Sequence, residues 1–293
     1  MTTSTLLLIL ASAVLHASWN LIGKKSAQSV AFYAWAMAAG MLIFSPLAIS
    51  VLPYLPQLNP EFWGLLLLSG LFQALYLTGL AQAYRHGNLG LVYPLARALP
   101  VLLVPLAVLL IYGQTRLDTG DGLGMLMIAG GALGLPLARW RELRLQHYCT
   151  PAIGWVLLAA ASTAGYSLTD SAAVQHLNRV GLSAFEAGSS FVVLQAGCCL
   201  LWLVPIIHLL LRQPLTPTQP RMIWLAGSFV IGTYLLILTS MTLVDEVSYV
   251  VALRQASIPI GVLIGVFWLG EPLSRPRLTG LLLMLAGLLM VAL

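Results

Sequence analysis

The chain has 293 residues, of which 59% are hydrophobic and 8% are charged, and its formal net charge is +5. Soluble globular domains contain about 25% charged residues, so 14 Lys and Arg with 9 Asp and Glu are too few to cover a surface in water. The composition excludes a water-soluble enzyme and a disordered chain, and the small, dispersed positive charge excludes a nucleic-acid-binding protein. A mean hydropathy of +0.92 indicates a chain surrounded by lipid.

Neither a metal site nor a cleaved signal peptide is expected. Cys149, Cys198 and Cys199 lack the CxxC spacing of zinc ligands, and two of them lie together in an apolar run. We interpret them as packing thiols and expect no metal and no other cofactor. The first 23 residues do not begin with the basic residues of a signal peptide, and Lys24 and Lys25 follow them. We therefore expect a membrane-spanning helix of the mature protein there.

Polar, charged and Pro-rich breaks divide the chain into ten apolar segments. A helix needs about 20 residues to cross a bilayer, and each segment is close to that length. The predicted spans are 4–23, 29–52, 62–84, 89–112, 119–138, 152–173, 182–211, 222–242, 246–270 and 276–293. The runs lack the two-residue alternation of barrel strands. We therefore expect an all-α integral membrane protein of ten transmembrane helices.

The two halves of the chain resemble each other. A shift of 157 residues aligns Leu126–Gly130 with Leu283–Gly287 and places Arg97 on Arg254. This division gives a first repeat at 1–138 (spans 1–5), an inter-repeat linker at 139–151 and a second repeat at 152–293 (spans 6–10). Because each repeat has five spans, the second must enter the membrane from the opposite face. The sequence thus predicts two inverted five-helix repeats around a central cavity.

Two arginines lie within predicted spans. Arg97 and Arg254 each lie eight residues into their span, which is about 12 Å deep at 1.5 Å per residue. Because an intramembrane Arg costs about 2.5–3.5 kcal/mol to insert, both should face a wet cavity or a partner. In one interpretation they line a central pathway and attract a carboxylate or phosphonate. In the other, each is bonded to helix carbonyls or a carboxylate and holds the repeats together.

The same two spans contain prolines. Pro94, Pro100 and Pro105 lie in the fourth span and Pro259 in the ninth. Proline frees a backbone carbonyl and permits a bend where protein or water satisfies that group. Bends beside the pathway would suit a gating helix pair, although membrane helices also use Pro in packing.

Other polar and aromatic residues could line a cavity together with the arginines. Tyr93 lies four residues before Arg97 and therefore shares its side of the helix. Aromatic walls with a few hydrogen-bonding groups suit a small amphipathic ligand, while any single Tyr could instead serve interhelical packing. The predicted substrate-binding residues are Arg97, Arg254, Gln73, Tyr76, Tyr93, Tyr234, Tyr249 and His16.

Only two carboxylates fall within the predicted spans and away from their ends. Asp170 and Glu186 both lie toward the face reached by the loop around Arg179. They could form a local salt bridge there, or one of them could be a proton-coupling carboxylate. The sequence shows no continuous proton relay through the centre of the membrane.

Several motifs together resemble the ten-helix EamA-type transporters of the drug/metabolite transporter superfamily. The most specific is Trp268-Leu269-Gly270-Glu271-Pro272-Leu273, which looks like the second EamA repeat. The similarity extends over the whole chain and includes Ala252-Leu253-Arg254-Gln255, Tyr93-Pro94-Leu95-Ala96-Arg97 and His16-Ala17-Ser18-Trp19-Asn20. In the first half the Gly-Glu-Pro motif is replaced by Gly113-Gln114-Thr115, so its Glu cannot be essential there.

The resemblance implies a fold and a general activity. It implies a basket of helices around a cavity formed largely by spans three, four, eight and nine. It further implies transport of small metabolites, often export of amino acids or related solutes, in the bacterial inner membrane. It does not specify the substrate.

Basic residues in the connections predict the orientation of the chain. Ten lie on one face and two, Arg116 and Arg179, on the other. The ten are Lys24, Lys25, Arg85, Arg139, Arg141, Arg144, Arg212, Arg221, Arg275 and Arg277. The positive-inside rule places these ten in the cytoplasm and both termini outside, whereas the resemblance implies termini inside. A single miscounted span would reverse the charge assignment.

The sequence as a whole favours a secondary transporter in the plasma membrane. We expect it to move a small metabolite, such as an amino acid or a related amphipathic or anionic solute, by alternating access and without ATP. A passive channel is the main alternative. An intramembrane enzyme is not expected, because no HExxH pair or catalytic Ser or Asp arrangement is present. The expected partners are the solute and the lipid bilayer, and the oligomeric state stays open, a monomer included.

Overall fold

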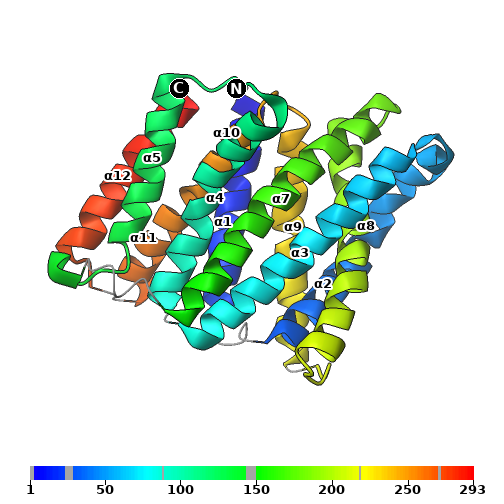
Figure 1. Cartoon of the computed structure of the whole chain (residues 1–293). Helices are drawn as coiled ribbons and strands as arrows, with labels where there is room; N and C mark the ends of the chain where they lie inside the picture. The colour runs from blue at the N-terminus through cyan, green and yellow to red at the C-terminus, as the bar shows by residue number, and fades with distance from the viewer. Residues whose placement is uncertain (1–2, 24–28, 88, 143–149, 218, 270–271) are drawn as a thin grey trace.

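The computed structural model describes residues 3–23, 29–87, 89–142, 150–217, 219–269 and 272–293. Within these ranges all regular structure is helical (Figure 1). The first half contains α1 (Thr3–Gly23), α2 (Val30–Phe44), η1 (Ser45–Gln57), α3 (Pro60–His86), α4 (Leu89–Tyr112), α5 (Thr119–Gly134) and η2 (Trp140–Glu142). The second half contains α7 (Pro151–Arg179), α8 (Ala184–Pro205), η3 (Ile206–Leu210), α9 (Pro220–Met241), α10 (Val247–Leu253), η4 (Arg254–Ala256), α11 (Ser257–Leu269) and α12 (Arg275–Ala292).

Eight helical segments of the described chain are long and apolar enough to cross a membrane. They correspond to α2 with η1, α3, α4, α7, α8 with η3, α9, α10 through α11, and α12. Large apolar side chains on them are exposed, and Leu110 and Phe267 keep 75% and 80% of their surface. Such a surface is unfavourable in water and suits contact with lipid. The chain is therefore an all-α, multi-pass membrane protein, as its composition predicts.

Several predicted spans differ in detail from the helices. The second span becomes a 3-10 segment after Phe44, where Pro46 is followed by Pro53 and Pro56. Each proline has no N–H to donate, which weakens the α-helical hydrogen bonding in this stretch. The fifth span ends at Gly134, so α5 has only 16 residues and is not among the eight long segments.

The ninth predicted span is interrupted at the arginine. The α-helical pattern gives way to a 3-10 turn, η4, between α10 and α11. Pro259 cannot donate to the carbonyl four residues earlier, which belongs to Gln255. The fourth span, in contrast, stays helical through three prolines. A bend was thus predicted in both spans, and the α-helix is broken only in the ninth.

Reciprocal capping boxes stabilise the starts of α5 and α8. Asp118 and Asp121 form a reciprocal capping box at the start of α5, and Ser183 and Glu186 form another at the start of α8. Each box satisfies backbone N–H groups that have no partner within the helix. Glu186 therefore caps its own helix.

Small residues allow α5 and α12 to pack closely. A Cβ atom at Gly131 would lie 2.5 Å from the carbonyl oxygen of Gly280, and one at Gly124 would lie 2.8 Å from that of Gly287. Gly131, which is later on α5, meets Gly280, which is earlier on α12. The two helices therefore run antiparallel. Close approach of this kind is the usual role of glycine between membrane helices.

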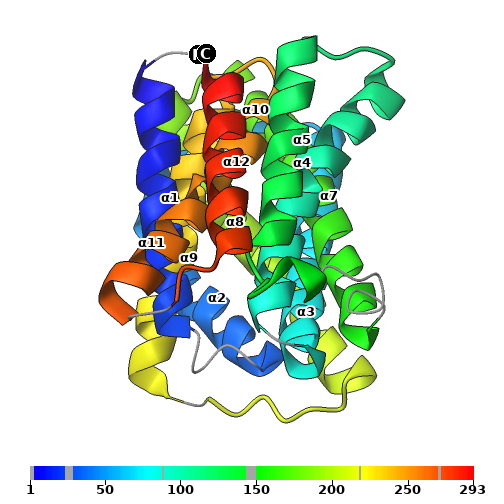
Figure 2. The same ribbon diagram turned by 90° about the vertical axis from the view of Figure 1, so that its left-hand side faces the viewer.

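Helix contacts in the two halves correspond to one another. α1 packs on α9 as α7 packs on α3, and α2 packs on α9 as α8 packs on α3. Likewise, α1 contacts α11 and η4 as α7 contacts α4, while α5 and α12 pair directly. Figure 2 shows the start of α1 and the end of α12 at the same end of the molecule. The elements that meet at the centre are α1, α2, α3, α4, α7, α8, α9 and η4.

Candidate functional site

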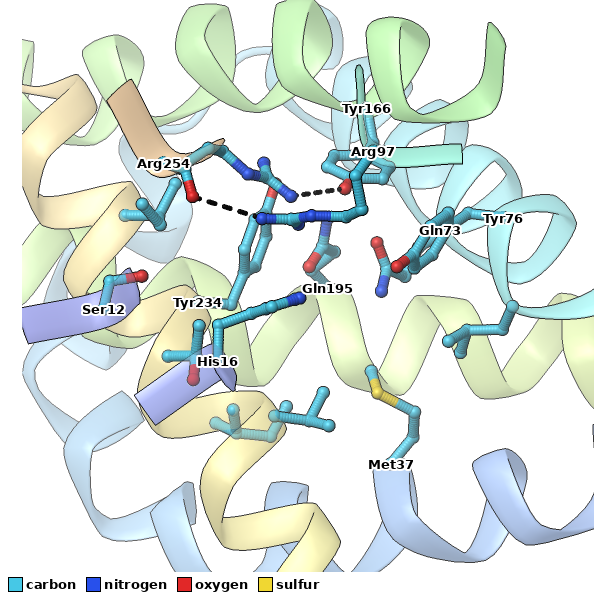
Figure 3. Close-up of a pocket in the computed structure, with 15 residues that line it drawn as sticks. Ser12, His16, Met37, Gln73, Tyr76, Arg97, Tyr166, Gln195, Tyr234 and Arg254 are labelled. Carbon is cyan, nitrogen blue, oxygen red and sulfur yellow. Dashed lines mark hydrogen bonds between the residues drawn. The ribbon is translucent and has the colours of Figure 1, made fainter. Parts of the chain in front are cut away.

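A central cavity lies among these helices (Figure 3). It contains about 640 Å³ of space free of protein atoms, including its opening. Its wall combines two arginines, three tyrosines, a histidine and two amides with aliphatic side chains. The lining residues are Ser12, His16, Met37, Gln73, Tyr76, Leu77, Arg97, Tyr166, Gln195, Val230, Ile231, Thr233, Tyr234, Ile237 and Arg254.

Arg97 joins the two halves of the chain at this cavity. It extends from α4, and its side chain is 5% exposed. Its Nη2 donates to the backbone carbonyl oxygen of Arg254 at 3.2 Å and to Ser257 Oγ at 2.8 Å. This bond to a helix carbonyl agrees with the second interpretation from the sequence, in which the arginine holds the repeats together. Because Arg97 also lines the cavity, the bond does not exclude a role in ligand binding.

Arg254 lies in η4, where the α-helix is interrupted. Its Nη2 donates to the hydroxyl of Tyr166 at 3.0 Å, and its guanidinium carbon is 5.9 Å from the centre of the same ring. A cation at this distance from an aromatic ring is attracted by the ring electrons. Its Nη1 is buried without a hydrogen-bond partner among the described residues. Arg254 therefore has a donor left for a ligand.

Three tyrosines form one wall. The rings of Tyr76 and Tyr166 meet edge to face with centres 5.7 Å apart, and those of Tyr166 and Tyr234 do so at 5.6 Å. Edge-to-face contacts stabilise aromatic pairs beyond their buried area. The tyrosines come from α3, α7 and α9, so this wall is assembled from both halves of the chain.

Asp170 lies behind this wall and is fully buried. Its carboxylate accepts hydrogen bonds from Ser69 Oγ, from the Tyr234 hydroxyl and from Gln195 Nε2, the last at 2.9 Å. Gln195 Nε2 also donates to Ser69 Oγ at 2.7 Å. The predicted salt bridge near Arg179 is therefore not the environment of Asp170. Four helices, α3, α7, α8 and α9, contribute to this cluster.

The structure brings most of the predicted binding residues to the cavity. Arg97, Arg254, Gln73, Tyr76, Tyr234 and His16 all line it. Gln73 Oε1 and Thr233 Oγ1 are buried without hydrogen-bond partners among the described residues. These atoms add an acceptor and a hydroxyl to the free donor of Arg254.

One predicted residue, Tyr249, is not brought to the cavity. The Tyr249 hydroxyl donates to Asp121 Oδ2 at 2.7 Å, and Tyr249 is absent from the cavity lining. This bond connects α10 to the start of α5. The side chain of Tyr93 lies outside the described part of the structure, as does Glu271 of the most specific sequence motif.

Sequence reasoning missed four residues of the site. They are Tyr166, Ser69, Gln195 and Met37, to which the sequence assigned no role in binding. The single Gln of the apolar helix α8 was the available signal, because a buried amide needs partners. Ser69 and Met37 have no such signal, since Ser and Met are common in membrane helices.

The cavity is positively charged and has no evident metal site. Its lining includes two guanidiniums and no carboxylate, and Asp170 lies one layer behind. Among the described residues, His, Cys, Asp and Glu form no group of three that could bind a metal ion. An anionic or dipolar organic solute fits this chemistry better than a cation.

Comparison with known proteins shows the fold alone. No protein-family model and no curated protein matches this sequence. A solved structure described as "Crystal structure of protein" is 17% identical and has a TM-score of 0.65. The alignment covers 99% of this chain and 96% of that chain. The helical arrangement is thus shared with another protein over its whole length.

Proposed function

We propose that this protein is a secondary transporter that moves a small metabolite through the central cavity by alternating access. The observation on which this rests is the meeting of Arg97 and Arg254, both buried, in a polar cavity inside an apolar helical shell. Buried charge in a membrane protein is costly and usually marks a pathway for a solute. The proposed solute is an amino acid or a related amphipathic or anionic compound, and the proposed direction is export.

Two inverted five-helix repeats, with ten membrane-spanning helices, are part of this proposal. The correspondence of helix contacts between the halves supports it, as does the antiparallel pairing of α5 with α12. A second pair of contacts agrees with the 157-residue shift. Gly40 packs against Gly227, and Gly70 packs against Cys198. Gly227 is 157 positions after Gly70, and Cys198 is 158 positions after Gly40.

Membership of the EamA-type group is likewise a proposal. It is supported by the motifs around Arg97 and Arg254 and by the full-length fold, and bacterial inner-membrane localisation follows from the same resemblance.

The proposed binding mode uses the unsatisfied polar atoms. A carboxylate or phosphonate would accept from Arg254 Nη1, and a donor on the solute would meet Gln73 Oε1. The tyrosine wall would contact the apolar part of the solute. Charge-assisted bonds to an arginine are roughly twice as strong as neutral ones, so the anionic group should dominate affinity.

A rigid bundle could not expose this cavity to both sides in turn. The interruption at η4 lies beside the cavity and between two helical rods, α10 and α11. Short segments of this kind absorb the dihedral changes of hinge motions. We propose that rotation at η4 changes the position of Arg254 relative to Arg97 during the cycle.

Flux into liposomes tests the function. Purified protein would be reconstituted and loaded with unlabelled amino acids, and uptake of a mixture of ¹⁴C-labelled L-amino acids would be measured. We expect saturable counterflow, which a passive channel does not show. Arg97→Ala and Arg254→Ala should abolish it, while Arg179→Ala, which changes an exposed arginine, should not. Unchanged flux in both cavity variants would remove the proposed role of the two arginines.

A further inference from the structure

The Asp170 cluster has a consistent donor order. Gln195 Nε2 donates to Ser69 Oγ and to Asp170, while Ser69 Oγ and the Tyr234 hydroxyl also donate to Asp170. The carboxylate accepts three bonds and donates none. Each of these neighbours can donate to Asp170, so the cluster can stabilise an ionised carboxylate, which only accepts hydrogen bonds.

Burial opposes this ionised form. Asp170 is 0% exposed, and a charge removed from water is stable only when it is paired or fully hydrogen-bonded. Three donors favour the anion while the apolar surroundings favour the neutral acid. These two effects oppose each other, so a nearby change in charge can shift the protonation of this carboxyl group.

The charged groups around Asp170 are few. The helices packed against α7 are α3, α4, α8, α9 and α10. They contribute, in the direction of the cavity, Tyr76 from α3, Arg97 from α4 and Tyr234 from α9, while Arg254 follows α10 and acts on Asp170 by its charge. α7 itself adds Tyr166. On α8 and α10, Glu186 and Tyr249 bond to Ser183 and Asp121 instead. The other titratable groups of α8 are the free thiols of Cys198 and Cys199.

Protonation of Asp170 would change the wall of the cavity. Tyr234 and Gln195 both line the cavity and both donate to Asp170. Once the carboxyl group has gained a proton, it must donate, and the adjacent hydroxyl must accept. The Tyr234 proton would then turn toward the cavity, where it could bond to a solute. Figure 3 shows the Tyr234 and Gln195 side chains beside Tyr166 and both arginines.

We propose that Asp170 is the proton-binding site of this transporter and that its protonation is coupled to solute binding. This proposal rests on the proposed transport function. A hydronium ion in the cavity gives a proton to the Tyr234 oxygen as the original Tyr234 hydroxyl proton passes to a carboxylate oxygen, which leaves a water molecule, an intact tyrosine hydroxyl and a neutral Asp170 carboxyl group. An anion at Arg254 repels the Asp170 carboxylate and thereby favours the protonated form. The proton and the anionic solute therefore bind together, by reciprocal linkage, and move in the same direction. The direction of net transport follows the larger of the two gradients, so the solute is exported when its outward gradient exceeds the inward proton gradient.

Infrared spectroscopy detects the proton without any solute. The full chain in lipid nanodiscs would be titrated from mildly acidic to mildly alkaline pH, and the carbonyl stretch of protonated carboxylic acids recorded. We expect a band that disappears as pH rises and that Asp170→Asn lacks. Asp245→Asn, which changes an exposed acid paired with Arg116, should retain the band. A band that persists in Asp170→Asn, or no titrating band in the wild type, would overturn the proposal.

Tyr234→Phe provides a second variant with Asp170 intact. Because it removes one donor to the anion, we expect the same band to persist to higher pH. An unchanged titration would contradict the proposed connection between Tyr234 and Asp170.

Proteoliposomes test the coupling itself. Uptake of the ¹⁴C-labelled L-amino-acid mixture would be measured as counterflow and as accumulation driven by a pH gradient, acidic outside. We expect the ratio of accumulation to counterflow to fall at least about fivefold in Asp170→Asn, the lower end of usual coupling. Asp245→Asn serves as the control. An unchanged ratio, or accumulation under the opposite gradient, would refute coupling in the proposed direction. Absence of wild-type counterflow would instead count against the proposed function for amino acids, while the infrared titration would still decide whether Asp170 binds a proton.

Discussion

Arg97 donates its Nη2 hydrogen to the backbone carbonyl of Arg254, the residue 157 positions further along the chain. The bond joins the two residues that align when the halves of the sequence are superposed. It leaves the side chain of Arg254 at the cavity, where Tyr166 accepts from it. The two arginines are thus inequivalent, because Arg97 bridges the halves whereas Arg254 retains a donor for a ligand.

Tyr166→Phe should lower stability and solute flux together. The substitution leaves Arg254 Nη2 without its acceptor while the ring contacts remain. Hydrogen bonds to charged groups contribute about 1.5–3 kcal/mol, so we expect a clear fall in the melting temperature of the purified protein. Tyr112→Phe, at an exposed tyrosine, is the matched control and should melt like the wild type. Equal melting of the two variants would show that the Tyr166 hydroxyl does not stabilise Arg254.

Gln73→Leu should reduce flux without reducing stability. Gln73 Oε1 is buried without a partner among the described residues, so an apolar side chain of similar size removes an unsatisfied group. Natural proteins often give up stability at such binding residues. We expect an unchanged or higher melting temperature and a loss of amino-acid counterflow.

Gln195→Leu provides the contrast to Gln73→Leu. Gln195 donates to both Ser69 and Asp170, and its loss leaves buried acceptors with fewer donors. We therefore expect Gln195→Leu to melt at a lower temperature than Gln73→Leu. A higher melting temperature for Gln195→Leu would contradict both assignments.

Gly131→Val should destabilise the α5–α12 pair. The new side chain would overlap the Gly280 carbonyl, which is backbone and cannot move aside. Overpacking of this kind costs about 1–3 kcal/mol. Gly130→Val is a control in the adjacent position, where a Cβ atom would meet only Leu283 Cδ2 at 3.8 Å. A thermal melt that drops for the first variant alone would support the close antiparallel contact.

The main features of the fold could be predicted from the sequence because they depend on composition and periodicity. Helix-length apolar runs and the polar breaks between them locate the elements to within several residues. The internal shift of 157 residues predicted that Arg97 and Arg254 are related. Their contact then requires only that the two spans meet at the centre.

The details of the site could not be predicted in the same way. The hydrogen bonds of Asp170 come from single polar residues, Ser69 and Gln195, on two other apolar helices. Nothing in their local sequence indicates which of several faces they occupy, because an apolar helix in lipid has no pronounced polar side. The interruption at η4 also depends on packing, since the three prolines of α4 leave that helix intact.

Cysteine labelling can test the orientation and the span count together. Arg116 and Asp245 form a 2.7 Å ion pair between the connections before α5 and before α10, so these two connections lie on one face. The charge asymmetry of the connections predicts that this face is outside. In a variant without native cysteines, an impermeant maleimide added to intact cells should label Arg116→Cys and leave Arg212→Cys unlabelled until the membrane is permeabilised. The reverse pattern would place both termini inside, and labelling of both sites in intact cells would mean that the predicted number of spans between them is wrong.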